Sequence, residues 1–203
     1  MLNRFFLKLA LAIPMLLAGA GAAHATILLS FNPSAQTVLL PNTVSVDLVV
    51  SGLGGGVSPA LGGFQFNILY NPGIVHATDA TFGLDLGDPG AFKALTSSDV
   101  SSPGAASVSE ISLLTSSDLV AGEPASFVLA TLDFQTVGGG TTPLSFDSVV
   151  LSDESGNILS FNASPGSITV LTPEPAFGGA AGVLLVAAIC KSLGPRRLFR
   201  GNK

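Results

Sequence analysis

Residues 43–51 read Thr-Val-Ser-Val-Asp-Leu-Val-Val-Ser, and apolar side chains recur along them at every second position. The apolar residues at every second position from Val44 to Val50 fall on one face of an extended chain, and Ser45 and Asp47 fall on the opposite face. Successive side chains of a β-strand point to opposite faces of the sheet, so a period of two is typical of a strand with one buried face. The stretch therefore predicts a half-buried strand.

Residues 64–70 form a second alternating stretch, Phe-Gln-Phe-Asn-Ile-Leu-Tyr, in which Tyr70 shares the apolar face with the two Phe and Ile. Residues 71–73, Asn-Pro-Gly, are turn formers that end it. Further strands are predicted at residues 27–31, 36–40, 107–113, 126–136, 144–151, 157–161 and 167–171. We expect residues 78–102 to be a long loop, and no convincing helix interrupts the strands. About nine short strands separated by turn residues predict an all-β antiparallel sandwich or jelly roll.

The N-terminal residues have the pattern of a secretory signal peptide. Arg4 and Lys8 precede an apolar run, and small residues end at Ala23-His24-Ala25. A charged region, an apolar region and a small-x-small site in this order predict cleavage by signal peptidase after Ala25 and export across the inner membrane. Residues 1–25 are therefore assigned as a signal peptide and residues 26–171 as the folded domain.

The C-terminal residues 172–203 have a different pattern. Pro173-Glu174-Pro175 precedes an uncharged apolar stretch over residues 176–190, and a basic tail that includes Arg196 and Arg197 follows. Fifteen residues rise only about 22 Å as a helix, so the span is short for a hydrocarbon core of about 30 Å. Lys191 can extend the span by reaching for the interface, and the arginines favour a cytoplasmic tail. The pattern predicts a transmembrane helix with the domain outside.

This arrangement resembles the PEP-CTERM sorting signal, which combines a Pro-Glu-Pro motif, a short apolar helix and an Arg-rich end. The resemblance implies processing at Pro173, Glu174 and Pro175 by an exosortase, in a Gram-negative bacterium that makes exopolysaccharide. It implies a membrane-anchored precursor and then a location on the outer surface or in the extracellular matrix. The alternative is a stiff linker before a permanent tail anchor.

Charge is distributed very unevenly along the chain. All 13 Asp and Glu lie in residues 26–175, where Lys93 is the only Lys or Arg, giving this part a formal charge of −12. Nucleic-acid binding requires cationic groups that displace counterions, so DNA and RNA are poor partners. The single cysteine, Cys190, lies in the apolar tail, so the domain has no disulfide, thiolate metal site or cysteine nucleophile.

The strand pattern also resembles that of cohesin domains. The resemblance rests on residues 27–31, 44–51, 64–75 and 126–136, with Tyr70-Asn71-Pro72 where the family has Tyr-Asp-Pro. The departure to Asn71 preserves turn chemistry. Cohesins are nine-stranded jelly rolls without a catalytic centre that bind calcium-loaded dockerin modules on one flat sheet face. The resemblance therefore implies a dockerin-like partner, and related carbohydrate-binding modules extend this to exopolysaccharide.

Candidate catalytic groups are few. His76 is the only histidine of the domain, so a Ser-His-Asp arrangement would depend on this one residue. Two pairs of carboxylates, Asp85 with Asp88 and Asp153 with Glu154, are the residue types that glycoside hydrolysis requires. Both pairs lie in turn-rich segments without an aromatic platform, which favours solvated turns.

Asp153, Ser155 and Asn157 surround Gly156 with closely spaced oxygen atoms, the ligands that calcium prefers. Neither the spacing of an EF-hand nor its distal Glu is present, and a hairpin turn explains the same residues. The loop is a weak calcium candidate, and no other cofactor is expected. The sequence thus predicts an exported, non-enzymatic binding or structural module; the alternative is a secreted carbohydrate-active enzyme or an accessory protein of polysaccharide degradation.

Overall fold

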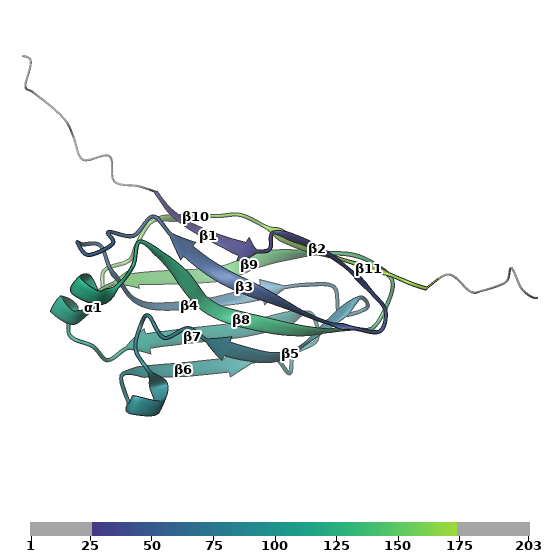
Figure 1. Cartoon of the computed structure of the whole chain (residues 1–203), viewed down its shortest axis with the longest axis horizontal. Helices are drawn as coiled ribbons and strands as arrows, with labels where there is room; N and C mark the ends of the chain where they lie inside the picture. Colours follow the sequence, from purple (N-terminus) through teal and green to yellow (C-terminus); the bar gives the residue numbers. More distant parts are fainter. Residues whose placement is uncertain (1–25, 174–203) are drawn as a thin grey trace, which may run out of the picture.

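The computed structural model describes residues 26–173, which form a sandwich of two β-sheets (Figure 1). The first sheet has five strands in the order β10 (Phe161–Ala163), β1 (Ile27–Asn32), β3 (Thr43–Ser51), β8 (Ser126–Thr136) and β5 (Val75–Phe82). The second has six in the order β2 (Ala35–Leu39), β11 (Gly166–Leu171), β9 (Gly140–Asp153), β4 (Leu61–Leu69), β7 (Ala105–Ser112) and β6 (Ala94–Asp99). A short 3₁₀ helix, η1 (Pro89–Ala91), and one α-helix, α1 (Ser116–Gly122), complete the described part.

The first two strands of the domain pair with its last two strands. β1 pairs in parallel with β10, and β2 pairs in parallel with β11, whereas all other strand pairs are antiparallel. β1 begins and β11 ends at opposite ends of the sandwich, and α1 lies at the end where β1 begins (Figure 1). The two ends of the described chain therefore leave the domain in opposite directions.

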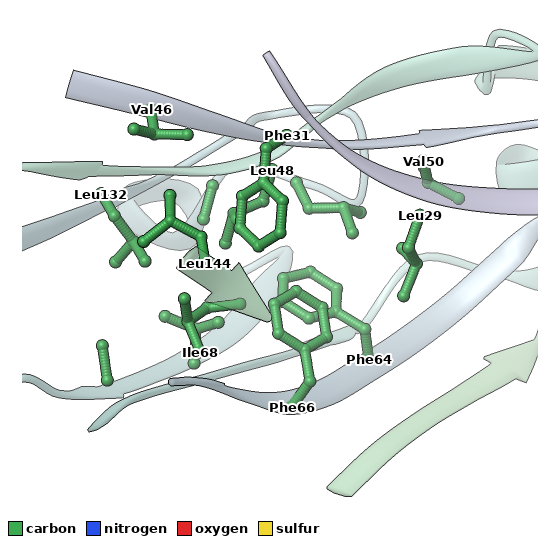
Figure 2. Close-up of a cluster of buried hydrophobic side chains, with 14 of the residues drawn as sticks. Leu29, Phe31, Val46, Leu48, Val50, Phe64, Phe66, Ile68, Leu132 and Leu144 are labelled. Atoms are coloured by element: carbon green, nitrogen blue, oxygen red, sulfur yellow. The ribbon is translucent and has the colours of Figure 1, made fainter. Parts of the chain in front are cut away.

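The core lies between the two sheets. Leu29, Val46 and Leu48 point down from the first sheet, and Phe66 and Ile68 point up from the second (Figure 2). All five side chains are at most 1% exposed. Burial of large apolar side chains from both inner faces is the main source of stability in such a sandwich.

Aromatic rings join the sheets at several depths. Phe31 of β1 stacks on Phe146 of β9 with ring centroids 4.4 Å apart. Tyr70, just after β4, meets Phe134 of β8 edge-on at 5.3 Å. These offset and edge-on geometries are the favourable ones for aromatic pairs, so they fix how one sheet lies on the other.

The predicted all-β sandwich is confirmed, and most predicted strands are present. The strands predicted at residues 43–51 and 126–136 are β3 and β8 with the same bounds, and Tyr70 is buried as expected. The chain turns at residues 71–74, where Asn71 Oδ1 accepts a hydrogen bond from the Gly73 amide at 2.9 Å. The described residues form eleven strands, two more than the predicted nine.

Three local predictions were wrong. Residues 78–102 are not one loop, because they contain most of β5, η1 and all of β6. Residues 157–161 do not form the predicted strand: Ile158 makes one isolated bridge to Ser152, and β10 starts only at Phe161. The helix α1 was not expected, although its N-cap Thr115 accepts a hydrogen bond from the Asp118 amide, a common start signal.

The expected loop was wrong because neither of its two strands alternates regularly between apolar and polar residues. A β-bulge between Ala77 and Asp79 interrupts the alternation of β5, and five of the six residues of the edge strand β6 are exposed. Neither strand therefore carries the period-two pattern.

Within residues 26–173 no helix has the length and apolar character needed to cross a membrane. The predicted signal peptide and transmembrane helix lie outside the described residues.

Candidate functional site

The candidate catalytic residues occupy strand and turn positions of the described domain. His76 is exposed on β5, opposite Gln135 of β8. Asp88 caps η1, since its Oδ1 accepts a hydrogen bond from the Gly90 amide at 2.8 Å. Asp85 lies in the exposed turn between β5 and η1. The positions of these side chains are accounted for by the strand and the turn that carry them.

The candidate calcium loop is a closed turn. Asp153 Oδ1 accepts the amides of Ser155 and Asn157, both at 2.8 Å, and Oδ2 accepts Asn157 Nδ2 at 2.9 Å. These hydrogen bonds, led by the one from the Asn157 side chain, lower the pKa of Asp153. Within the described residues no group of three or more His, Cys, Asp or Glu side chains is arranged to hold a metal ion. Calcium binding by Asp153, Ser155 and Asn157 stays a prediction.

The processing residues fall almost entirely outside the described part of the chain. Ala23 and Ala25 precede it, and Glu174, Pro175, Arg196 and Arg197 follow it. Pro173 is its last residue, exposed two positions after the end of β11. Signal cleavage and sorting stay predictions.

The surface most suited to recognition is the outer side of β6, β7, β4 and β9, which we call the four-strand face. Strand registers place its side chains in three rows across these strands. The rows are Leu95–Ile111–Gly63–Ser152, Ser97–Ser109–Gln65–Val150 and Asp99–Ser107–Asn67–Asp147.

Two shallow depressions of about 180 Å³ each lie side by side on this face. One is over Gly63, between Ile111 and Val150, and both are lined by Gln65 and Ser109. A Cβ at Gly63 would lie 3.0 Å from the Glu110 carbonyl oxygen. A larger residue would therefore displace β7 relative to β4 and fill the first depression. The absence of a side chain at Gly63 therefore helps to form the floor of the first depression.

The four-strand face combines exposed apolar side chains with free polar groups. Leu95 is 59%, Ile111 60% and Val150 46% exposed. None of the hydrogen bonds among residues 26–173 uses the side chains of the central row, Ser97, Ser109 and Gln65. Covering such a surface removes apolar area from water and offers new hydrogen-bond partners, which is typical of binding sites.

Charge is confined to one margin of the four-strand face. Asp99 and Asp147 end the third row on its two sides. Hydrogen bonds from the side chain and backbone of Ser101 lower the pKa of Asp99, so this carboxylate stays ionised at neutral pH. The four-strand face therefore has a neutral centre and a negative margin.

The outer side of the five-stranded sheet is different. Thr131 Oγ1 donates to Asp47 Oδ1 at 2.7 Å, and Ser45 Oγ donates to Asp133 Oδ1 at 2.5 Å. Asp79 lies opposite Asp133 across the β5–β8 ladder. On this acidic face the hydroxyl groups of Thr131 and Ser45 are therefore hydrogen-bonded within the face itself.

Sequence reasoning did not find the four-strand face. The alternation in residues 64–70 already put Gln65 and Asn67 on the outer side of β4, and Ser107, Ser109 and Ile111 alternate in the same way on β7. The sequence did not show that β6 pairs with β7, because β6 lies within residues 78–102, which were expected to form a loop. Without β6 the surface would consist of three strands and would end at β7.

Comparisons with known proteins concern the fold. No known family model and no curated protein matches this sequence. The seventh ScaB type I cohesin of Pseudobacteroides cellulosolvens has 17% identity and a TM-score of 0.57, over 74% of this chain and 96% of its own. A chain of a type I cohesin–dockerin complex from Clostridium thermocellum has 13% identity and a TM-score of 0.58, over 72% and 99%.

A non-cellulosomal cohesin from the archaeon Archaeoglobus fulgidus has 16% identity and a TM-score of 0.53, over 77% of this chain and 98% of its own. At such low identity the likeness shows the fold alone. The described domain is thus a cohesin-like jelly roll, as the strand pattern predicted.

Proposed function

Starting from a cohesin-like sandwich, we propose that this chain is an exported, non-enzymatic module that binds a dockerin-like protein partner on the four-strand face. Solved cohesins from Clostridium thermocellum and Acetivibrio cellulolyticus are in complex with dockerins. The observation that carries the proposal for this chain is the depression over Gly63. There the free polar groups of Gln65 and Ser109 lie beside exposed Ile111 and Val150.

The chemistry of the face defines the partner. Its centre would fit a surface with apolar side chains and neutral hydrogen-bonding groups, placed over the two depressions. Within residues 26–173 Lys93 is the only Lys or Arg, so the module is strongly acidic. Opposite charge speeds the encounter of two proteins, so the partner is expected to carry Lys or Arg at the margin near Asp99 and Asp147.

The binding test uses the exported protein immobilised against a panel of dockerin modules loaded with calcium. The expected result is saturable binding of at least one dockerin, with an association rate that falls as salt is raised. If no dockerin binds while a soluble exopolysaccharide does, the proposed partner class is wrong and a carbohydrate partner replaces it.

Export and sorting complete the proposal. Residues 1–25 direct export, and residues 172–203 hold a precursor in the membrane until an exosortase acts at Pro173–Pro175. The exposure of Thr172 and Pro173 beyond β11 supports access to this site. The released or anchored module then acts on the outer surface or in the extracellular matrix.

Mass spectrometry of the protein recovered from the culture medium and envelope tests the sorting proposal. The expected mature chain starts at Thr26 and lacks the basic tail. Recovery of a chain that still ends at Lys203 would contradict processing and favour a permanent anchor.

A further inference from the structure

Two carboxyl groups are buried near the end of the sandwich that carries α1. Glu110 of β7 is 1% exposed and Glu123, the C-cap of α1, is 3% exposed. Oε1 of each has no hydrogen-bond partner within residues 26–173. A buried carboxylate without partners is costly, so both positions require an explanation beyond packing.

Glu123 connects α1 to the six-stranded sheet. Its Oε2 accepts a hydrogen bond from the Leu61 amide at 2.6 Å, at the start of β4. Leu119 is the only buried side chain of α1, and its carbonyl accepts the Glu123 amide at 2.9 Å. The attachment of α1 therefore depends on the apolar side chains of Leu119 and Val120, on one buried carboxyl group and on the hydrogen bond from Ser116 Oγ to the Glu154 carbonyl.

Glu110 occupies an inward position of β7. Ala106, Val108 and Glu110 are alternate residues and all are buried, and Glu110 is opposite Phe64 in the ladder with β4. Its neighbours along the strand, Ser109 and Ile111, belong to the four-strand face. A charge at Glu110 is thus placed on the core side of the sheet, directly behind the candidate binding surface.

The charged groups facing these two carboxyl groups are all acidic. Asp85, from the turn after β5, acts on both, and Glu154, after β9, acts on Glu123. The neighbouring segments add Asp118 on α1, Asp88 beside η1 and Asp153 before Glu154, while β4 contributes no charged residue. The sole lysine of the described chain, Lys93, lies between η1 and β6.

This environment favours the neutral carboxyl form. Burial, helped by repulsion from Asp85, raises the pKa of Glu110 to about 7. Burial also raises the pKa of Glu123 to about 7, against the Leu61 hydrogen bond and with repulsion from Asp85 and Glu154. Both groups therefore change charge near neutral pH in the folded protein, whereas an unfolded chain loses these protons near pH 4.5.

We infer that the α1 end of the sandwich is an acid-stabilised clamp, in which neutral Glu110 and Glu123 keep α1 and β7 packed against β4 and loosen them when they ionise. The stabilisation is fully present below about pH 4.5 and is lost as the pH rises through about 7. Each group changes the folding equilibrium by on the order of 100-fold over this interval. The inference is independent of the partner proposed above.

Amide hydrogen exchange of the full exported protein, corrected for intrinsic rates, at pH 5 and pH 7.5 tests the clamp. The expected result is a loss of protection at the higher pH for the amides of Leu61, Leu119 and Glu123, larger than for the central β3–β8 ladder. Equal changes in both regions, or none, would overturn it. Recovery of α1 protection at pH 7.5 on addition of millimolar calcium alone would also overturn it, in favour of a cation site.

Neutral variants provide the second measurement. Glu110→Gln with Glu123→Gln is expected to flatten the pH dependence of the urea midpoint between pH 4.5 and 7.5, because neither side chain can ionise. Asp79→Asn, exposed on β5, is the matched control and is expected to keep the slope of the wild-type protein. An unchanged slope in the double variant would overturn the clamp; if that variant does not fold, the exchange measurement on the wild-type protein decides.

Discussion

The outer faces of the two sheets are both formed by outward-pointing side chains of β-strands, but they differ in how their polar groups are hydrogen-bonded and in how much apolar area they expose. On the five-stranded sheet, Asp47 and Asp133 are bonded to hydroxyl groups of neighbouring strands. On the four-strand face, exposed Ile111 lies beside polar groups that have no protein partner among the described residues. A surface that already satisfies its polar groups gains little from being covered, whereas a half-apolar surface with free groups gains from a partner.

The sharpest way to separate folding from recognition is to compare the two sides of β4. Phe66→Ala removes a fully buried ring between the sheets and is expected to lower the free energy of unfolding by about 3–5 kcal/mol. Gln65→Ala, its neighbour on the outer side, is expected to change it by less than about 0.5 kcal/mol. Urea unfolding of both variants checks this, and similar losses would contradict the assignment of inner and outer faces.

A charge on the four-strand face should weaken partner binding without unfolding the domain. Ile111→Asp is expected to raise the Kd for the bound partner by about 10-fold or more, because the carboxylate would be desolvated beside Val150. Leu39→Asp, on the edge strand β2, has nearly the same exposure and is the matched control. Equal weakening by both variants would point to a general effect of charge and against this face.

The smallest effect is expected on the acidic face. Asp133→Ala removes the acceptor of Ser45 Oγ and should lower the free energy of unfolding by about 1 kcal/mol, with partner affinity unchanged. Calorimetric unfolding and the same binding assay measure both quantities. A loss of binding here would transfer the candidate site to the five-stranded sheet and reverse the comparison.

Sequence patterns predicted the half-buried strands well, because burial of one face imposes a period of two. The same patterns did not predict β5 and β6, because neither strand has a period of two. β5 contains a β-bulge, and β6 is an exposed edge strand. They also gave no role to Glu110. Its alternation with Val108 indicates an inward position, but a carboxyl group is expected at the surface, so only the packed structure identifies it as buried.

The amino-acid sequence alone determined that the domain is an acidic β-sandwich with Phe64, Phe66 and Ile68 inside, since these properties follow from composition and local alternation. Tertiary structure decided which strands are neighbours, and therefore that β6 and β9 flank β7 and β4 to form the four-strand face. It also decided that Glu123 reaches Leu61 across 62 residues of chain. Strand order and such distant contacts depend on how whole faces pack together, and no short stretch of sequence contains that information.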